Sequence, residues 1–266
     1  MNKTFLFSCA LSIGLVSCTE QASNFDATAL DSTALEAITE ESYKAHVAQL
    51  ASDDFLGRKP FTKGDTLTVN YIEEQFKAIG LEPGNGDSYF QEVPMVEITS
   101  NPVEPNLTFK GKNGSISVKS LDDFVIGTRK LKENTLVEDT ELIFAGFGIV
   151  APEYNWNDYE GLDVNGKTVV VMVSDPGRYD KNLFKADTMT YYGRWRYKFE
   201  EAGRQGATGI LLIHETGAAS YGWDVVRSGW SGPQLELTTN NPDELPEFEG
   251  WVSTPTAEKL FKLASL

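Results

Sequence analysis

The sequence predicts an α/β mixture in which amphipathic helices alternate with short strands along 266 residues. Three observations support this fold class. Apolar residues recur at helical spacing between residues 32 and 80, and a β-branched run at 167–173 is typical of a buried strand. A helical segment at 192–205 then separates that run from a second apolar strand at 209–213. This strand–helix–strand order indicates a local α/β unit within a β-rich module.

Residues 1–18 are predicted to be a signal peptide. Lys3 supplies a positive charge, and the apolar run at 5–16 is shorter than the roughly 20 residues that span a membrane as a helix. The run ends in Leu15-Val16-Ser17-Cys18, which resembles the lipobox of bacterial lipoproteins. That resemblance implies export to the bacterial cell envelope, cleavage before Cys18 and lipidation of Cys18, with anchoring in the outer membrane or at the cell surface. The alternative is an ordinary signal peptide with a cysteine at its cleavage site.

Charge and cysteine usage exclude several classes of function. The chain has 23 Lys+Arg against 39 Asp+Glu, and loss of Lys3 with the leader makes the net charge −17. We expect no nucleic-acid partner, because binding a phosphate backbone needs clustered basic side chains. Cys9 would leave with the leader and Cys18 would be acylated, which excludes disulfides, thiolate metal sites and a cysteine nucleophile. The polar residues 19–33 are predicted to form a flexible tether.

Residues 34–100 are predicted to form two helices and a strand. The first helix is expected over 32–51, and the second begins at Asp65 and ends at Gly80, a typical C-terminal cap. A strand is expected over 88–98, at a sheet edge because Pro94 interrupts it. The apolar positions of the two helices are Leu35, Ile38, Tyr43, Val47 and Leu50, then Val69, Ile72, Phe76 and Ile79.

Residues 101–255 have the β-rich pattern. Segments 107–110 and 116–119 flank Lys112-Asn113-Gly114, and the Asn-Gly pair predicts a hairpin turn. Residues 140–150 are predicted to be another strand. An amphipathic helix is expected over 256–266, at the end of the sequence.

One motif resembles a dinucleotide fingerprint. Gly146-Phe147-Gly148-Ile149-Val150-Ala151 follows a predicted strand and satisfies G-x-G-x-x-A. That chemistry needs a helix N-terminus to direct amides at the pyrophosphate, whereas residues 152–159 have the pattern of a loop. The favoured interpretation is two small residues in a tightly packed strand.

The sequence predicts no metal site. Its two histidines are His46 and His214. His214-Glu215 begins like H-E-x-x-H, but position 218 is Ala, so a packing role is favoured for His214 and a place at the polar border of a helix for His46. Oxygen ligands for calcium are available in residues 155–160, although the spacing of an EF-hand loop is missing. These residues are Asn155, Asn157, Asp158 and Glu160.

The sequence also predicts no catalytic residue. Gly229-Trp230-Ser231-Gly232-Pro233 breaks G-x-S-x-G at its last position and no strand is expected before it. Asp53-Asp54 is typical of a helix cap or turn, and Glu73-Glu74 and Glu200-Glu201 are expected on solvated helix faces. The residues alone therefore indicate a lipid-anchored binding or accessory module.

Two stretches resemble a known family. The first resembles the N-terminal lead-in of secreted zinc aminopeptidases, the di-zinc exopeptidases related to glutamate carboxypeptidase and glutaminyl cyclase. It consists of Asp53-Asp54-Phe55-Leu56-Gly57-Arg58, Thr62-Lys63-Gly64, Tyr71-Ile72, Phe76, Gly80-Leu81-Glu82-Pro83 and Tyr89-Phe90-Gln91-Glu92-Val93-Pro94. The second resembles the protease-associated domain inserted in many of those enzymes. It consists of Phe144-Ala145-Gly146-Phe147-Gly148-Ile149, Tyr159, Gly161-Leu162-Asp163-Val164, Gly166-Lys167, Gly203, Gly206-Ala207, Ile213-His214-Glu215 and Tyr221-Gly222-Trp223.

The resemblance implies the N-terminal part of a peptidase α/β domain at residues 34–100, an inserted protease-associated domain at 101–255 and the start of a truncated helix at 256–266. It also implies two zinc ions in the full-length enzyme, peptide or protein substrates, and a missing C-terminal catalytic domain. In the family, the zinc ligands and the catalytic Glu lie downstream of the insert, and no position here matches them. We therefore expect a metallo-aminopeptidase fragment that binds no zinc and is inactive alone.

Two other functions are compatible with the residues. One is a free-standing, lipid-anchored module that binds peptide or protein through a protease-associated domain. The other is a nucleotide-dependent oxidoreductase that uses residues 146–151, which the loop pattern after the motif disfavours.

Overall fold

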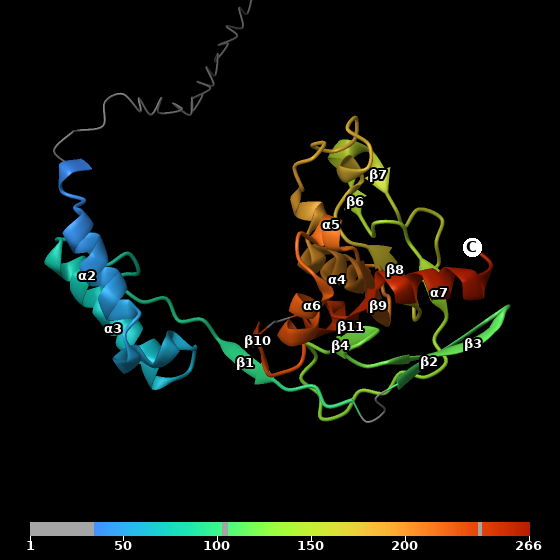
Figure 1. The fold of residues 1–266 in the computed structure, drawn as a ribbon, viewed down its shortest axis with the longest axis horizontal. Coiled ribbons are helices and arrows are strands. Elements are labelled where there is room, and N and C mark those ends of the chain that lie inside the picture. The colour runs from blue at the N-terminus through green and yellow to red at the C-terminus, as the bar shows by residue number, and fades with distance from the viewer. Residues whose placement is uncertain (1–34, 103–105, 239–240) are drawn as a thin grey trace, which may run out of the picture. The chain divides into compact units, whose positions relative to one another are not determined.

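The computed structural model describes residues 35–102, 106–238 and 241–266. The predicted signal peptide, the tether and Cys18 lie outside these ranges. The chain divides between Gln91 and Glu92 into two compact units, which we call unit 1 and unit 2 (Figure 1). Within the described ranges, no helix is both long enough and apolar enough to cross a membrane.

Unit 1 consists of helices α2 (Glu40–Leu50) and α3 (Lys63–Ala78), joined through the 3₁₀ segment η2 (Asp53–Arg58). The predicted first helix is shorter than expected, because the Thr39 side chain accepts a hydrogen bond from the Ser42 amide and caps α2 there. Asp53 and Asp54 begin η2, as the turn interpretation predicts. Gly80 follows α3 with a φ of 78°, a conformation that suits glycine and confirms the predicted stop.

The apolar side chains of unit 1 are largely exposed. Helix α2 has no buried residue, and the apolar positions of α3 are 37–71% exposed. The α3 positions are Val69, Ile72, Phe76 and Ile79. A helix normally buries such a stripe against another element. Unit 1 therefore has apolar surface that its own described residues do not cover.

Unit 2 is built on a five-stranded sheet with the strand order β4-β11-β9-β8-β5 (Figure 1). β11, β9, β8 and β5 are parallel, and β4 pairs antiparallel with β11. The strands are β4 (Phe124–Gly127), β5 (Leu142–Phe144), β8 (Thr168–Met172), β9 (Gly209–His214) and β11 (Phe248–Ser253). All six residues of β9 are buried, as expected for a parallel strand covered on both faces.

The predicted strand–helix–strand unit is confirmed as β8, α4 and β9. Helix α4 (Trp195–Arg204) begins three residues later than the predicted segment, because residues 191–193 form the separate 3₁₀ turn η5 (Tyr191–Gly193). β8 and β9 are adjacent and parallel, which a crossover helix makes possible. The described residues form an α/β mixture, as the sequence predicts.

Two apolar layers cover the faces of the sheet. One face packs on α4, α5 (Thr216–Ala219) and α6 (Trp223–Gly229), through a cluster that includes Phe199, Val226 and Trp251. The other face packs on the hairpin of β2 (Asn106–Gly111) and β3 (Gly114–Lys119) and on α7 (Thr254–Ala264). The predicted hairpin and final helix are thus present, and both contribute to the core of unit 2.

Two predicted strands are shorter than expected. Within residues 140–149 only β5 is a strand, because Gly146 and Gly148 turn the chain with φ values of 50° and 64° before β6 (Val150–Ala151). β6 pairs with β7 (Trp156–Asn157), and η3 (Pro152–Tyr154) lies between them. Of residues 88–98, only β1 (Met95–Ile98) is a strand; it follows Pro94 and pairs with β10 (Gln234–Leu237). The remaining 3₁₀ turns are η4 (Pro176–Arg178) and η6 (Pro242–Glu244).

The close packing predicted for Gly146 and Gly148 is confirmed, but the predicted strand is wrong, because the two glycines lie in a turn between β5 and β6. A Cβ at Gly146 would lie 2.7 Å from the Asp158 carboxylate, and one at Gly148 would lie 2.7 Å from Val171. No α-helix N-terminus follows the motif; the next elements are β6 and η3. The glycines therefore allow close packing, and the motif lacks the helix that a dinucleotide site needs.

We predict that Gly203→Ala destabilises unit 2 by at least about 1–3 kcal/mol, the usual cost of overpacking. A Cβ at position 203 of α4 would lie 1.8 Å from the Glu244 carbonyl oxygen, so backbone must move. The gain in helix propensity, about 1 kcal/mol, is smaller than this cost. Urea unfolding measures the difference. The matched control is Gly229→Ala at the end of α6, where a Cβ meets no atom within 4 Å. Equal stability of the two variants would contradict the prediction.

Candidate functional site

The best candidate for a functional site is a cavity of about 360 Å³ on the α4–α6 face of the unit 2 sheet. Its volume is at the low end of the range that small-ligand sites occupy, about 300–1,000 Å³. Residues from β4, α4, α6, β10 and β11 line it. We call it the tryptophan groove and define it by Ile126, Trp195, Trp230, Glu236, Glu249 and Trp251.

Three tryptophans form the walls of this groove. Trp195 is the first residue of α4, Trp230 follows the last residue of α6, and Trp251 lies in β11. The Phe199 ring lies 5.6, 6.0 and 6.5 Å from those of Trp195, Trp230 and Trp251, each in an edge-to-face arrangement. Trp195 and Phe199 are four residues apart on one helix face. The buried side chain of Phe199 thus packs against all three tryptophans.

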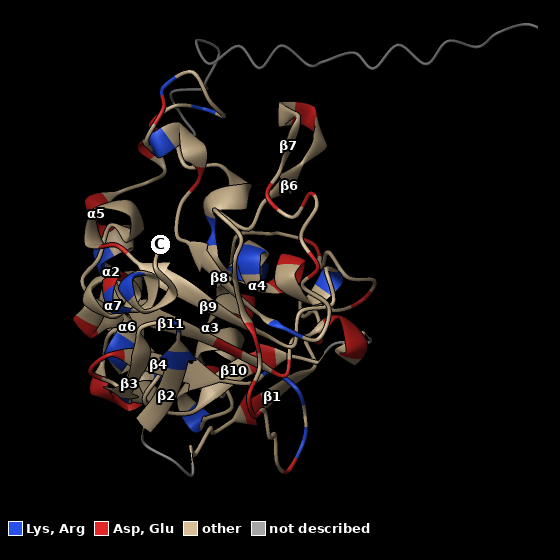
Figure 2. Cartoon of the chain, turned by 90° about the vertical axis from the view of Figure 1, so that its right-hand side faces the viewer, with Lys and Arg blue, Asp and Glu red and all other residues tan. Residues whose placement is uncertain are grey.

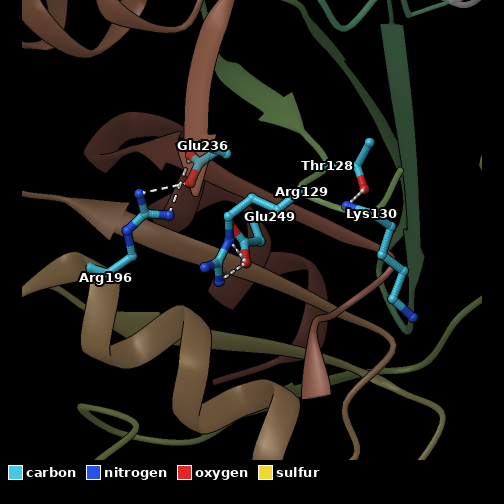
Figure 3. Close-up of polar contacts among 6 residues, drawn as sticks. All are labelled: Thr128, Arg129, Lys130, Arg196, Glu236 and Glu249. Carbon is cyan, nitrogen blue, oxygen red and sulfur yellow. Dashed lines mark hydrogen bonds and ion pairs between the residues drawn. The ribbon is translucent and has the colours of Figure 1, made fainter. Parts of the chain in front are cut away.

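A buried ion pair lies beside these rings (Figure 3). Glu249 is on the same face of β11 as Trp251, two residues away, and Arg129 lies two residues beyond Gly127, which pairs with Glu249 in the β4–β11 ladder. The Arg129 Nε lies 2.8 and 2.9 Å from the two carboxylate oxygens of Glu249. The two side chains are 14% and 4% exposed. Burial raises the pKa of Glu249, and the Arg129 charge opposes that rise.

A second ion pair joins α4 to β10 (Figure 3). Arg196 donates from Nη2 and Nη1 to the two oxygens of Glu236, at 2.9 and 3.3 Å. Its guanidinium carbon also lies 5.1 Å from the centre of the Trp195 ring. Nearby, Lys130 and Lys132 both contact Glu247, at 2.8 and 2.9 Å. Figure 2 marks the acidic and basic positions along the whole ribbon. The four charged side chains that line the groove, Arg129, Arg196, Glu236 and Glu249, therefore form two ion pairs.

His46 belongs to unit 1 and His214 to unit 2, and each contacts a partner within its own unit. His214 is 3% exposed; its Nε2 lies 3.0 Å from the Tyr221 carbonyl oxygen, and burial lowers its pKa. The packing interpretation of His214 is confirmed. His46 is exposed on α2, and its Nδ1 lies 2.7 Å from the Tyr71 hydroxyl.

The other predicted donors stabilise local backbone. Asp158 accepts a hydrogen bond from the Ile149 amide at 3.0 Å, and Asn157 accepts one from the Tyr159 amide at 2.9 Å. Ser231 donates to the Ser228 carbonyl and follows helix α6, so the strand that a nucleophile elbow needs does not precede it. In the part of the chain that the structure describes, no three His, Cys, Asp or Glu side chains could hold a metal ion.

One prediction about carboxylates is wrong. Glu201 was expected on a solvated face of α4 but is 6% exposed. Its carboxylate accepts hydrogen bonds from Arg204, from Gln205 and from the Tyr197 hydroxyl, at 2.7–3.3 Å. These partners, three and four residues away on the same helix, replace the water that the carboxylate loses. Glu201 therefore stabilises α4 from a buried position and does not face solvent.

Sequence reasoning also missed Lys198. Its side chain is fully buried at the start of α4, and Nζ donates to the Phe147 carbonyl oxygen at 2.6 Å. Burial lowers the pKa of Lys198 to about 7, while the charges of Asp158 and Asp175 oppose the shift. Lys198 thus joins α4 to the loop that holds the Gly146–Gly148 motif. No sequence pattern distinguishes this lysine from the exposed ones.

We predict that Lys198 makes stability depend on pH. The ordinary pKa of lysine is 10.5 and the native pKa is about 7. Between these values the unfolded chain holds a proton that the native state lacks, so the free energy of unfolding rises with pH, by up to about 1.4 kcal/mol per pH unit. Lys198→Met should remove this rise, which urea unfolding at pH 7, 8, 9 and 10 measures. The control Lys112→Met, at an exposed position, should keep it. Equal slopes in the two variants would contradict the prediction.

Comparisons with known proteins give a likeness to solved structures. No protein-family model and no curated protein matches the chain. A solved structure, the aminopeptidase from Aneurinibacillus sp. strain AM-1, aligns with 79% of this chain at 17% identity and a TM-score of 0.33. The aligned region covers 38% of that aminopeptidase. This is a weak structural likeness to an aminopeptidase.

Proposed function

We propose that this chain is the peptide-binding, non-catalytic portion of a zinc-dependent aminopeptidase of the bacterial cell envelope. The tryptophan groove is the observation that carries the proposal. Its walls are aromatic, and its charged side chains are paired with one another, an arrangement that suits binding of a ligand better than proton transfer to it. The choice of enzyme family comes from the motifs in residues 53–94 and 144–223.

The described residues do not fit the two zinc ions of that family. A catalytic zinc site takes three or more protein ligands from His, Asp, Glu or Cys. Here His46 contacts the Tyr71 hydroxyl and His214 contacts the Tyr221 carbonyl oxygen, and the two belong to different units. We therefore assign neither zinc binding nor a hydrolytic step to these residues. In this proposal the zinc ligands and the catalytic Glu belong to a catalytic domain outside this sequence.

The exposed apolar stripe of α3 supports such a catalytic domain. Val69, Ile72 and Phe76 are 37–40% exposed, and Ile79 is 71% exposed. Together with the exposed side chains of α2 they form surface that soluble proteins normally cover. We propose that the catalytic domain covers this stripe. Anchoring through an acylated Cys18, which would hold the enzyme in the envelope, is part of the same proposal.

An antibody against this chain tests the enzyme assignment. We expect it to precipitate, from envelope extracts of the source cells, an antigen with aminopeptidase activity. That activity should be lost on treatment with a zinc chelator and restored by added zinc. A precipitated antigen without such activity would refute the assignment to an aminopeptidase.

A free-standing peptide-binding lipoprotein is the second candidate, because the groove alone would serve it equally well. In that case the precipitated antigen would have the mass of this chain after signal-peptide cleavage and would not hydrolyse peptides. A larger antigen with chelator-sensitive activity would exclude this candidate.

A further inference from the structure

We infer that the tryptophan groove binds an uncharged, extended peptide segment, which pairs with the edge of β4 and places one apolar side chain among the tryptophans. The inference deepens the proposed function and rests on it in taking a peptide as the ligand. Three features of the groove carry it: an unpaired main-chain edge, aromatic walls and charges that are already compensated.

Ile126 supplies the unpaired main-chain groups of this edge. β4 is an edge strand of the five-stranded sheet, and Ser253 donates to the Asp123 carbonyl oxygen at 2.9 Å just beyond the β4–β11 ladder. Hydrogen-bonded pairs alternate along an antiparallel ladder, so Val125 and Gly127 bond to β11 and Ile126 directs its N–H and C=O away from it. These two groups have no hydrogen-bond partner among the described residues, and Ile126 lines the groove. An extended peptide is the ligand that can use such a donor and acceptor.

The aromatic walls select an apolar side chain. Trp195 is 37% exposed, so it offers apolar surface to a ligand, whereas Trp251 is 2% exposed and closes the groove from the sheet side. The Nε1–H of Trp251 is buried and has no hydrogen-bond partner in the described part of the chain. Burying one apolar side chain of a peptide here would contribute about 1.5–3 kcal/mol.

The paired charges disfavour a charged ligand. An anion that approaches Arg129 or Arg196 meets the negative charge of Glu249 or Glu236 beside it, and a cation meets the positive charge of an arginine. Displacing a partner from the buried Arg129–Glu249 pair leaves an uncompensated charge, which is costly. The groove therefore favours a neutral segment. A saccharide could also stack on tryptophan, but it would leave the N–H and C=O of Ile126 without the paired partners that a strand provides.

Calorimetric titration of the purified chain tests this inference. The probe is the capped peptide Ac-Thr-Val-Leu-Val-Thr-NH2, which we expect to bind. Two related peptides should bind at least about tenfold more weakly: one with an N-methyl group on the central leucine, which blocks strand pairing, and one with Glu in place of that leucine. Chitotriose, a neutral saccharide, should not bind. Failure of the first peptide, equal binding of all three peptides, or binding of the saccharide alone would overturn the inference.

Four protein variants locate the binding site. Trp195→Ala should weaken binding at least about tenfold, while Tyr191→Ala, at a residue 64% exposed outside the groove, should leave it unchanged. Ile126→Pro removes an N–H that points away from β11, which an edge strand tolerates, so it should abolish binding. Ile126→Ala keeps the N–H and should retain binding. If Ile126→Pro fails to fold, the N-methylated peptide tests the same contact. Unchanged binding in Trp195→Ala would refute the site.

The outcomes separate the two proposals. Chelator-sensitive activity in the precipitated antigen, without peptide binding by this chain, would refute peptide binding in the groove and leave the enzyme assignment standing. Peptide binding without that activity would refute the assignment and leave the groove.

Discussion

Arg129→Met is expected to lower the free energy of unfolding by about 3–5 kcal/mol at pH 7, the usual result of removing one partner from a buried ion pair. The reason is the burial of Glu249, which is 4% exposed and held by the Arg129 guanidinium. Without that guanidinium, the carboxylate must stay charged in an apolar site or take up a proton. Urea unfolding measures the loss.

The loss should shrink at low pH. Burial raises the pKa of Glu249 above its ordinary value of 4.5, and removal of Arg129 should raise it further. Between 4.5 and the native pKa, the native state holds a proton that the unfolded chain has lost, so stability falls as pH rises through this window. The deficit of Arg129→Met should therefore be smaller at pH 4.5 than at pH 7.

The matched control for this pair is Arg196→Met. Arg196 is 36% exposed and Glu236 17%, so solvent screens their interaction and the expected loss is about 0–1 kcal/mol. The double variant Arg129→Met, Glu249→Met removes both buried charges and should recover most of the loss. A loss in Arg129→Met no larger than that in Arg196→Met would contradict the assignment of a buried pair.

Phe199→Ala is expected to cost about 3–5 kcal/mol, the range for a large buried aromatic side chain. Phe199 is 0% exposed in α4 and packs edge-to-face on Trp195, Trp230 and Trp251. Its removal opens a cavity beneath the tryptophan groove, so we also expect weaker binding of the leucine peptide. Urea unfolding and calorimetry measure the two effects.

Leu136→Ala is the control for Phe199→Ala, because Leu136 is 79% exposed in the same unit. Its loss should stay within about 0.5 kcal/mol. If Phe199→Ala loses stability but binds the peptide as tightly as the wild type does, Phe199 supports the core without shaping the groove.

Local patterns predict much of unit 2. The β-branched run of β8 and the apolar run of β9 have the composition of strands buried on both faces, and the helical spacing between them leaves a crossover helix as the connection. The Asn113-Gly114 pair predicts the β2–β3 hairpin in the same way. In each case the residues that decide an element lie within that strand, helix or turn.

The tryptophan groove could not be predicted because its parts are distant in sequence. Arg129 and Glu249 are 120 positions apart, and the three tryptophans come from α4, the end of α6 and β11. Their contact depends on the register of β4 against β11 and on the packing of α4, which no local pattern specifies. Glu201 and Lys198 show the same difficulty. Both are charged residues on a helix, and only the fold buries them.

We propose that this chain binds peptides and does not cleave them. Its most direct test mixes the purified chain with the uncapped peptide Thr-Val-Leu-Val-Thr and zinc, follows binding by calorimetry, and follows the peptide mass over time. We expect saturable binding and a peptide that keeps its N-terminal residue with or without added zinc. Removal of the N-terminal threonine that a zinc chelator stops, or the absence of binding, would contradict it.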